Sequence, residues 1–176
     1  MDAIDDKQGR TSLGLGSRLV VGALAGLAGT MVMTVAMRRM HARLPAKERY
    51  PLTPREIVDA AAAPPESAAR DLTLAAHFAY GAGCGALLAA ADPRAGRLTG
   101  ATAGAAIWLV SYMGWVPAFG LLKPATGHPA RRNAAMLAAH LAWGWSTAAA
   151  MRELGEARET IFAGGEDKDA VSRRGG

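Results

Sequence analysis

Four long stretches of the chain contain no Asp, Glu, Lys or Arg. They are residues 19–37, 72–91, 98–122 and 134–151. A helix needs about 20 apolar residues, at a rise of 1.5 Å each, to cross a hydrocarbon core of ~30 Å. Three stretches reach that length and the fourth is marginal. A surface helix of a soluble protein would show a polar face every third or fourth residue, and these stretches do not. We therefore predict an all-α integral membrane domain over residues 19–151 with four transmembrane helices.

Two other arrangements fit the same pattern. One is a soluble, alanine-rich helical bundle, which is disfavoured because a chain of 176 residues is too small to bury four helices on every side. The other is three spans plus a peripheral helix. The flanking residues 1–18 form a polar tail, and the charged residues 152–176 are expected to be disordered.

The first loop contains a helix-start signal. Residues 53–56 read Thr-Pro-Arg-Glu, which predicts a capping box with proline at the first helical position. A short helix over residues 54–63 should follow, with Ile57 and Val58 on its apolar face and Pro64-Pro65 ending it. We expect it to lie at the membrane interface or over the mouth of the bundle, although a solvated loop helix fits equally well.

The chain also resembles itself. Residues 74–81 and 137–144 are identical at six of eight positions, and residues 22–28 and 100–106 at five of seven. Chance similarity between alanine-rich segments is the alternative, but it accounts poorly for a histidine, an aromatic residue and a glycine in register. We predict two tandem hairpins of two spans each, which form a parallel repeat because each copy crosses the membrane twice.

Pairs of glycines four residues apart line single helix faces. Such small residues let helix backbones approach closely in a bilayer. Packing among the four helices is the simpler interpretation, and a homodimer seam is the alternative. The glycines concerned are Gly22, Gly26, Gly81, Gly85, Gly100 and Gly104.

Charge and composition argue against several classes of function. The net charge is +5 and the pI is about 9.9, but acidic residues are interleaved with the basic ones, so nucleic acid is not an expected partner. A single cysteine excludes a disulfide scaffold. No nucleophile elbow, zinc-protease motif or nucleotide-binding loop occurs, so we expect no enzymatic activity, no catalytic residues and no metal. Basic residues near the span ends favour a cytoplasmic location for loops 38–71 and 123–133.

Two histidines offer chemistry inside the spans. His77 and His140 are predicted to lie at similar depth and to face each other, near Tyr80 and Trp143. Each could simply fasten the bundle by hydrogen bonds. Alternatively, they form a proton-responsive pair, or they ligate a b-type haem whose propionates pair with arginines. No cofactor is the main expectation.

The last span carries a family resemblance. Residues 140–146, followed by the charged residues 152–154, resemble the last span of the YagU-like small inner-membrane proteins of bacteria. Residues 22–30 and Pro54-Arg55 are also similar to that family. The resemblance implies a multi-pass bacterial plasma-membrane protein of poorly defined function, and it brings no catalytic residues with it.

These observations lead to a ranked set of functional expectations. The first is a non-enzymatic membrane protein with a structural or stress-related role, or an accessory subunit of a membrane complex. The alternatives are an oligomeric transporter or channel-like protein, and a haem-binding membrane protein. The expected partners are the lipid bilayer and either further copies of the chain or a larger membrane complex.

Overall fold

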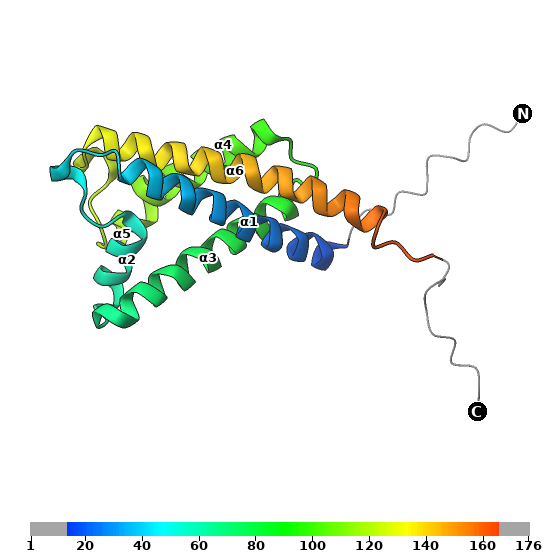
Figure 1. The fold of residues 1–176 in the computed structure, drawn as a ribbon, viewed down its shortest axis with the longest axis horizontal. Coiled ribbons are helices and arrows are strands. Elements are labelled where there is room, and N and C mark those ends of the chain that lie inside the picture. The colour runs from blue at the N-terminus through cyan, green and yellow to red at the C-terminus, as the bar shows by residue number, and fades with distance from the viewer. Residues whose placement is uncertain (1–13, 166–176) are drawn as a thin grey trace, which may run out of the picture.

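The computed structural model describes residues 14–165, which form helices and connecting turns without a strand. The chain folds as predicted into an all-α structure dominated by long helices (Figure 1). The helices are α1 (Leu15–His41), α2 (Thr53–Ala62), α3 (Glu66–Ala91), α4 (Arg97–Val110), α5 (Val116–Ala118) and α6 (Ala130–Glu159). Short 3-10 turns cover Ala46–Glu48 and Ala125–Gly127, and a π-helical turn covers Ser111–Trp115.

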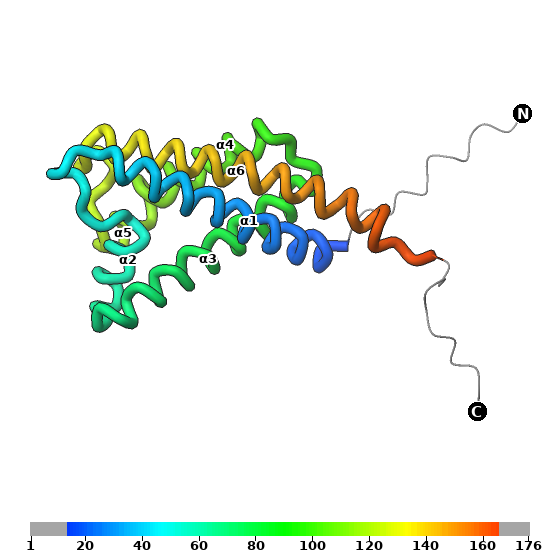
Figure 2. The backbone as a smooth tube through the Cα atoms, in the orientation of Figure 1, coloured from blue at the N-terminus to red at the C-terminus, as the bar shows by residue number. Residues whose placement is uncertain are grey.

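The long helices lie in the order α3, α1, α6, α4. Helix α1 packs against both α3 and α6, and α6 packs in turn against α4. We call α1 with α3 the first hairpin, and α4 with α6 the second. Both ends of the described chain lie at one end of the molecule, and α2 and α5 lie at the other (Figure 2). This arrangement places the loops 42–65 and 119–129 together.

Two of the four predicted spans correspond to helices that could cross a membrane. Helices α1 and α3 are each long and apolar enough to cross a bilayer. The stretch 98–122 is not one continuous helix, because α4 ends at Val110 and the π-helical turn and α5 follow. Helix α6 is continuous, but its histidine, tryptophans and hydroxyl side chains make it less apolar than the other two.

Two tail boundaries need correction. Helix α1 starts at Leu15, inside the predicted tail 1–18, since Gly14 and Gly16 do not stop a helix that is apolar beyond them. Helix α6 continues to Glu159, inside the predicted tail 152–176, because its arginines and glutamates are good helix formers. Residues 1–13 and 166–176 lie outside the described part of the chain.

Glycine sets the closest approaches within each hairpin. A Cβ atom added at Gly85 would lie 2.7 Å from Cα of Gly26 and would also meet the carbonyl of Gly22. In the second hairpin, a Cβ at Gly100 would meet the carbonyl of Gly144 and Cβ of Ala148. The backbones therefore touch at these crossings, with no room for a side chain. Gly81 and Gly104 line the same crossings: a Cβ at Gly81 would meet Thr30 and one at Gly104 the carbonyl of His140.

Candidate functional site

A cavity of about 230 Å³ lies between the two hairpins, beneath α2. Apolar side chains from α2, α5 and α6 form part of its wall, and four aromatic rings from α3, α4 and the π-helical turn form another. His77 and His140 complete it. The lining residues include Ile57, Val58, His77, Tyr80, Trp108, Tyr112, Trp115, Val116, Met136 and His140. The cavity therefore brings both histidines together with four aromatic rings.

The two histidines meet in this cavity but differ in their hydrogen bonds. His140 donates from Nδ1 to the carbonyl of Met136, one turn earlier in its own helix, at 2.8 Å. The Nε2 atom of His77 is buried and has no hydrogen-bond partner in the described part of the chain. His77 and His140 also line a smaller hollow of about 50 Å³. His140 thus bonds its own helix and not a neighbouring one, so the fastening of the bundle by histidine hydrogen bonds stays a prediction for both residues.

The other two predicted site residues have separate roles. The hydroxyl of Tyr80 lies 2.9 Å from Oγ of Ser111 and so links α3 to the π-helical turn. Trp143 donates from Nε1 to the hydroxyl of Thr30 at 3.2 Å, and Thr30 donates to the carbonyl of Gly26 at 2.7 Å. Trp143 therefore joins α6 to α1 at the helix crossing. The sequence reasoning missed Thr30, whose signal was its place directly after the glycine-rich stretch of residues 22–29.

The π-helical turn shapes one wall of the cavity. Ser111, Tyr112 and Trp115 belong to it and all three line the cavity. Pro117 follows the turn, and it lacks an N–H and so cannot continue the regular α-helical ladder. The structure absorbs this defect by widening the preceding turn. Such π-helical turns occur often at functional sites, because they re-aim side chains that a regular helix would point elsewhere.

Helix α2 covers the cavity, and the predicted capping box does not form. No side chain caps its first turn. The hydroxyl of Thr53 donates instead to the hydroxyl of Tyr112 at 3.1 Å, and the carboxylate of Glu56 accepts from Arg132 at 3.1 Å. Both residues of the expected box thus hold α2 against the bundle. The short helix lies over the bundle mouth, one of the two places expected for it.

Arg132 anchors the first loop to α6. Its side chain is 1% exposed, and its Nη atoms donate to the carbonyls of Glu48, Tyr50 and Pro51 at 2.8–3.2 Å, besides Glu56. The guanidinium also lies 3.6 Å from the ring centre of Tyr50. From the sequence, this arginine was counted only as a charge at a span end, since no local pattern reveals partners some 80 residues away.

An ion network joins α2 to the start of α3. Arg55 bonds both Asp59 and Glu66, and Arg70 also bonds Glu66. The hydrogen bonds from Arg55, and then those from Arg70, lower the pKa of Glu66 from 4.5 to about 2. The same carboxylates raise the pKa of Arg55 above its usual range. The network keeps α2 in place over the cavity without burying a charge.

Two ring nitrogens in the cavity wall are buried without a hydrogen-bond partner within residues 14–165. Besides Nε2 of His77, the Nε1 atom of Trp108 is buried without a partner. An indole N–H is a donor only, so it requires an acceptor. Buried polar groups normally have partners, so these two ring nitrogens mark the cavity wall as a candidate binding site.

A haem is too large for this cavity. The cavity volume of about 230 Å³ is smaller than the ~300–1,000 Å³ of clefts that hold drug-sized ligands. A porphyrin is larger than most drug-sized ligands. Within residues 14–165, no group of three or more His, Cys, Asp or Glu side chains could hold a metal ion. The haem alternative therefore gains no support from the geometry.

Comparisons with protein-family profiles, with curated proteins and with solved structures gave no match. The resemblance to the YagU-like proteins and the tandem repeat therefore stay predictions.

Proposed function

We propose that the protein is a four-span membrane protein of the bacterial plasma membrane. In our proposal, it binds a small, flat, apolar molecule with a carbonyl oxygen, such as a quinone ring, between its hairpins. The observation that carries the proposal is a pair of buried ring nitrogens, on His77 and Trp108, which have no partner within residues 14–165 although both side chains line an aromatic cavity. Binding would need no catalytic group, which agrees with the non-enzymatic expectation.

The exposed surface supports the membrane location. Only 39% of the most apolar stretch of α1 and 17% of that of α3 is buried inside the protein, whereas the core helix of a soluble protein would be mostly buried. Large apolar side chains face outward on several helices, among them Val20 (60% exposed), Leu87 (70%) and Leu98 (74%). A lipid environment removes the cost of this exposure, which in water would favour aggregation.

The length of the helices supports two further spans. The unit from Arg97 to Ala118 contains 22 residues and would extend about 33 Å at 1.5 Å per residue, enough to cross the hydrocarbon core. Helix α6, with 30 residues, would extend about 45 Å. Helix α6 packs against α1, and α4 packs against α6. The π-helical turn after α4 buries Tyr112, and such local π adjustments are tolerated in membrane helices.

The chemistry of the cavity favours a carbonyl ligand over a hydrocarbon. A site that is built to hydrogen-bond its ligand discriminates strongly against an analogue without the polar atom, since its own buried groups then stay unpaired. The four aromatic rings suit a flat ring system. The oligomeric transporter alternative stays a prediction.

A matched pair of probes tests the proposal. Menadione and 2-methylnaphthalene have the same two fused rings, and only menadione has carbonyls. We expect the protein in nanodiscs to bind menadione at least tenfold more tightly, as measured by equilibrium dialysis against empty nanodiscs. Equal binding of the two probes would overturn the proposal.

Matched variants locate the site. Trp108→Phe removes the indole N–H, and we expect about tenfold weaker menadione binding, the equivalent of ~1.4 kcal/mol for one hydrogen bond. Trp145→Phe is the control, because this ring is partly exposed near Arg97 at the opposite end of the molecule. Equal losses in the two variants would place the binding elsewhere.

A further inference from the structure

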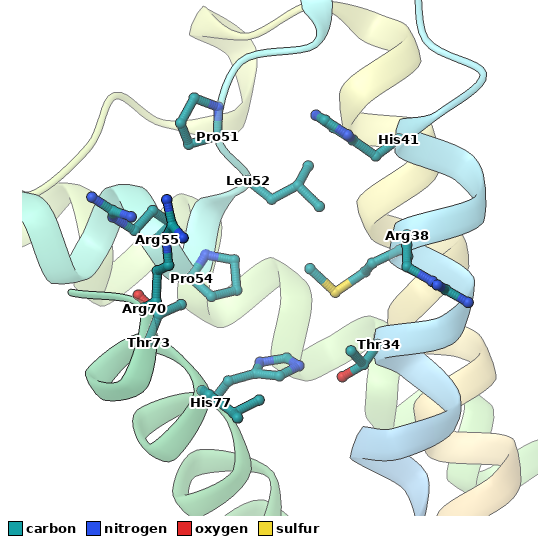
Figure 3. A pocket seen from close by; sticks show the side chains of 12 residues that line it. Thr34, Arg38, His41, Pro51, Leu52, Pro54, Arg55, Arg70, Thr73 and His77 are labelled. Carbon is teal, nitrogen blue, oxygen red and sulfur yellow. The ribbon is translucent and has the colours of Figure 1, made fainter. Parts of the chain in front are cut away.

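A second hollow, of about 450 Å³, lies between α1 and α3, where the two helices diverge. It is open to the outside, and we call it the lateral groove (Figure 3). Its walls are mostly apolar and include Met37, Leu52, Pro54 and Leu74. In Figure 3 the ring of His77 extends from α3 toward α1 at the inner end of the groove. His77 and Pro54 also line the cavity under α2, so the two hollows share a wall.

Three arginines line the outer part of the groove, and in Figure 3 the side chain of Arg38 extends from α1 on the side away from α3. Arg38 comes from the last turn of α1, Arg55 from α2 and Arg70 from the second turn of α3. Arg55 and Arg70 share Glu66, and Arg55 also bonds Asp59. Within residues 14–165, the side chain of Arg38 has no ion pair or hydrogen bond. Three cations against two carboxylates leave the rim with a net positive charge.

The polarity of the groove follows the helix axes. Arg38 and Arg70 lie near the loop end of the bundle, and Thr34, Leu74 and His77 lie deeper, about one to two turns toward its middle. A soluble anion would satisfy the rim but leave the apolar walls empty. An occupant that matches both parts has an anionic head at the rim and an apolar chain along the helices.

We propose that the lateral groove is a binding site for an anionic phospholipid. Its phosphate lies at Arg38 and Arg70, and the first part of one acyl chain lies against Met37 and Leu74. Basic pockets between membrane helices at the cytoplasmic face recognise such headgroups. This inference rests on the proposed membrane location, and it does not depend on a ligand in the cavity under α2.

Native mass spectrometry of the full chain in detergent tests the site. The probes are phosphatidylglycerol and phosphatidylcholine with identical acyl chains. We expect the wild type to retain phosphatidylglycerol with at least tenfold higher affinity. Equal affinity for the two lipids would overturn the proposal, and so would displacement of phosphatidylglycerol by millimolar glycerol 3-phosphate, which would show a site for a free anion.

Two adjacent arginines provide a matched comparison. Arg38→Gln removes the unpaired rim cation and should lower phosphatidylglycerol affinity about tenfold. Arg39→Gln removes the same charge from the next position of the same exposed turn, but Arg39 does not line the groove, and its affinity should stay within twofold of the wild type. Equal losses in both variants would indicate general surface charge and refute a defined site.

A steric variant separates the chain from the headgroup. Leu74 is 56% exposed, so Leu74→Trp can fold while its indole fills part of the groove. We expect it to weaken both lipids, whereas Arg38→Gln weakens only phosphatidylglycerol. Unchanged lipid binding in Leu74→Trp would contradict the acyl-chain placement. Extraction of the wild type from membranes by carbonate would refute the membrane proposal itself, whereas retention without lipid selectivity would refute only the lateral site.

Discussion

Replacing Arg132 with methionine should loosen the first loop and α2 from the bundle. The substitution keeps much of the side-chain volume but removes the guanidinium. Three loop carbonyls and the Glu56 carboxylate then lose their donors, at present 2.8–3.2 Å away. The stacking on the Tyr50 ring is lost as well.

The size of the expected loss of stability follows from two opposing energies, the lost hydrogen bonds and the removed cost of burying a charged guanidinium. Four hydrogen bonds from a charged donor, at ~1.5–3 kcal/mol each, would total about 6–12 kcal/mol. The cost of keeping a guanidinium away from water is several kcal/mol and disappears in the variant. The difference agrees with the ~3–5 kcal/mol typical of removing one member of a buried ion pair. We therefore expect Arg132→Met to lower the free energy of unfolding by about 4 kcal/mol.

Arg131 offers the matched control. It precedes Arg132 in α6 and is exposed, so Arg131→Met should change the free energy of unfolding by less than about 0.5 kcal/mol. Reversible unfolding in mixed micelles gives the free energies, and hydrogen exchange over residues 48–62 shows whether the loss is local. If the two variants unfold alike, the anchoring role assigned to Arg132 is wrong.

Three further predictions use single positions. Gly85→Ala should lower the free energy of unfolding by about 1–3 kcal/mol, because the new Cβ would lie 2.7 Å from Cα of Gly26. Gly83 has open space around it, so Gly83→Ala should leave the free energy of unfolding unchanged or raise it by up to about 1 kcal/mol. Equal unfolding free energies of the two variants would contradict this. The pKa of Glu66 is lowered to about 2 from 4.5, so its contribution to stability is full above about pH 4.5 and is lost as the pH falls toward 2. The difference in unfolding free energy between the wild type and Glu66→Gln should therefore shrink over that range, and a constant difference would refute the role of the network. Ala63 ends α2 with φ = 41°, so Ala63→Gly should raise the melting temperature by relieving ~1 kcal/mol of left-handed strain, and a lower melting temperature would count against it.

The sequence was most informative about the positions and ends of single helices. Charge-free stretches located α1 and α3, and Pro54 and Pro64-Pro65 bounded α2 to within a residue or two. Such signals are local, since helix length and proline chemistry depend on neighbours along the chain. The glycine spacing likewise marked residues that lie at helix crossings.

Contacts between segments that are distant in the sequence could not be predicted. Thr53 and Glu56 form a capping-box pattern, and nothing local shows that Tyr112 and Arg132 compete successfully for their side chains. The π-helical turn depends on how the helix accommodates Pro117. The same residues are compatible with a kink, a break or a widened turn. The burial of Arg132 required the loop to fold back onto α6.

The cavity itself follows from a gradient of side-chain size along each hairpin. At one end of the bundle, glycine backbones touch, and toward the loops methionine, leucine and tryptophan side chains push the helices apart. His77 and His140 each lie four residues before the glycine of a crossing, Gly81 and Gly144, and so share its helix face one turn toward the open end. The same spacing in both hairpins brings the two histidines to one cavity. A glycine that closes a helix crossing and a histidine one turn away therefore suffice to place a polar group at the inner end of an apolar opening.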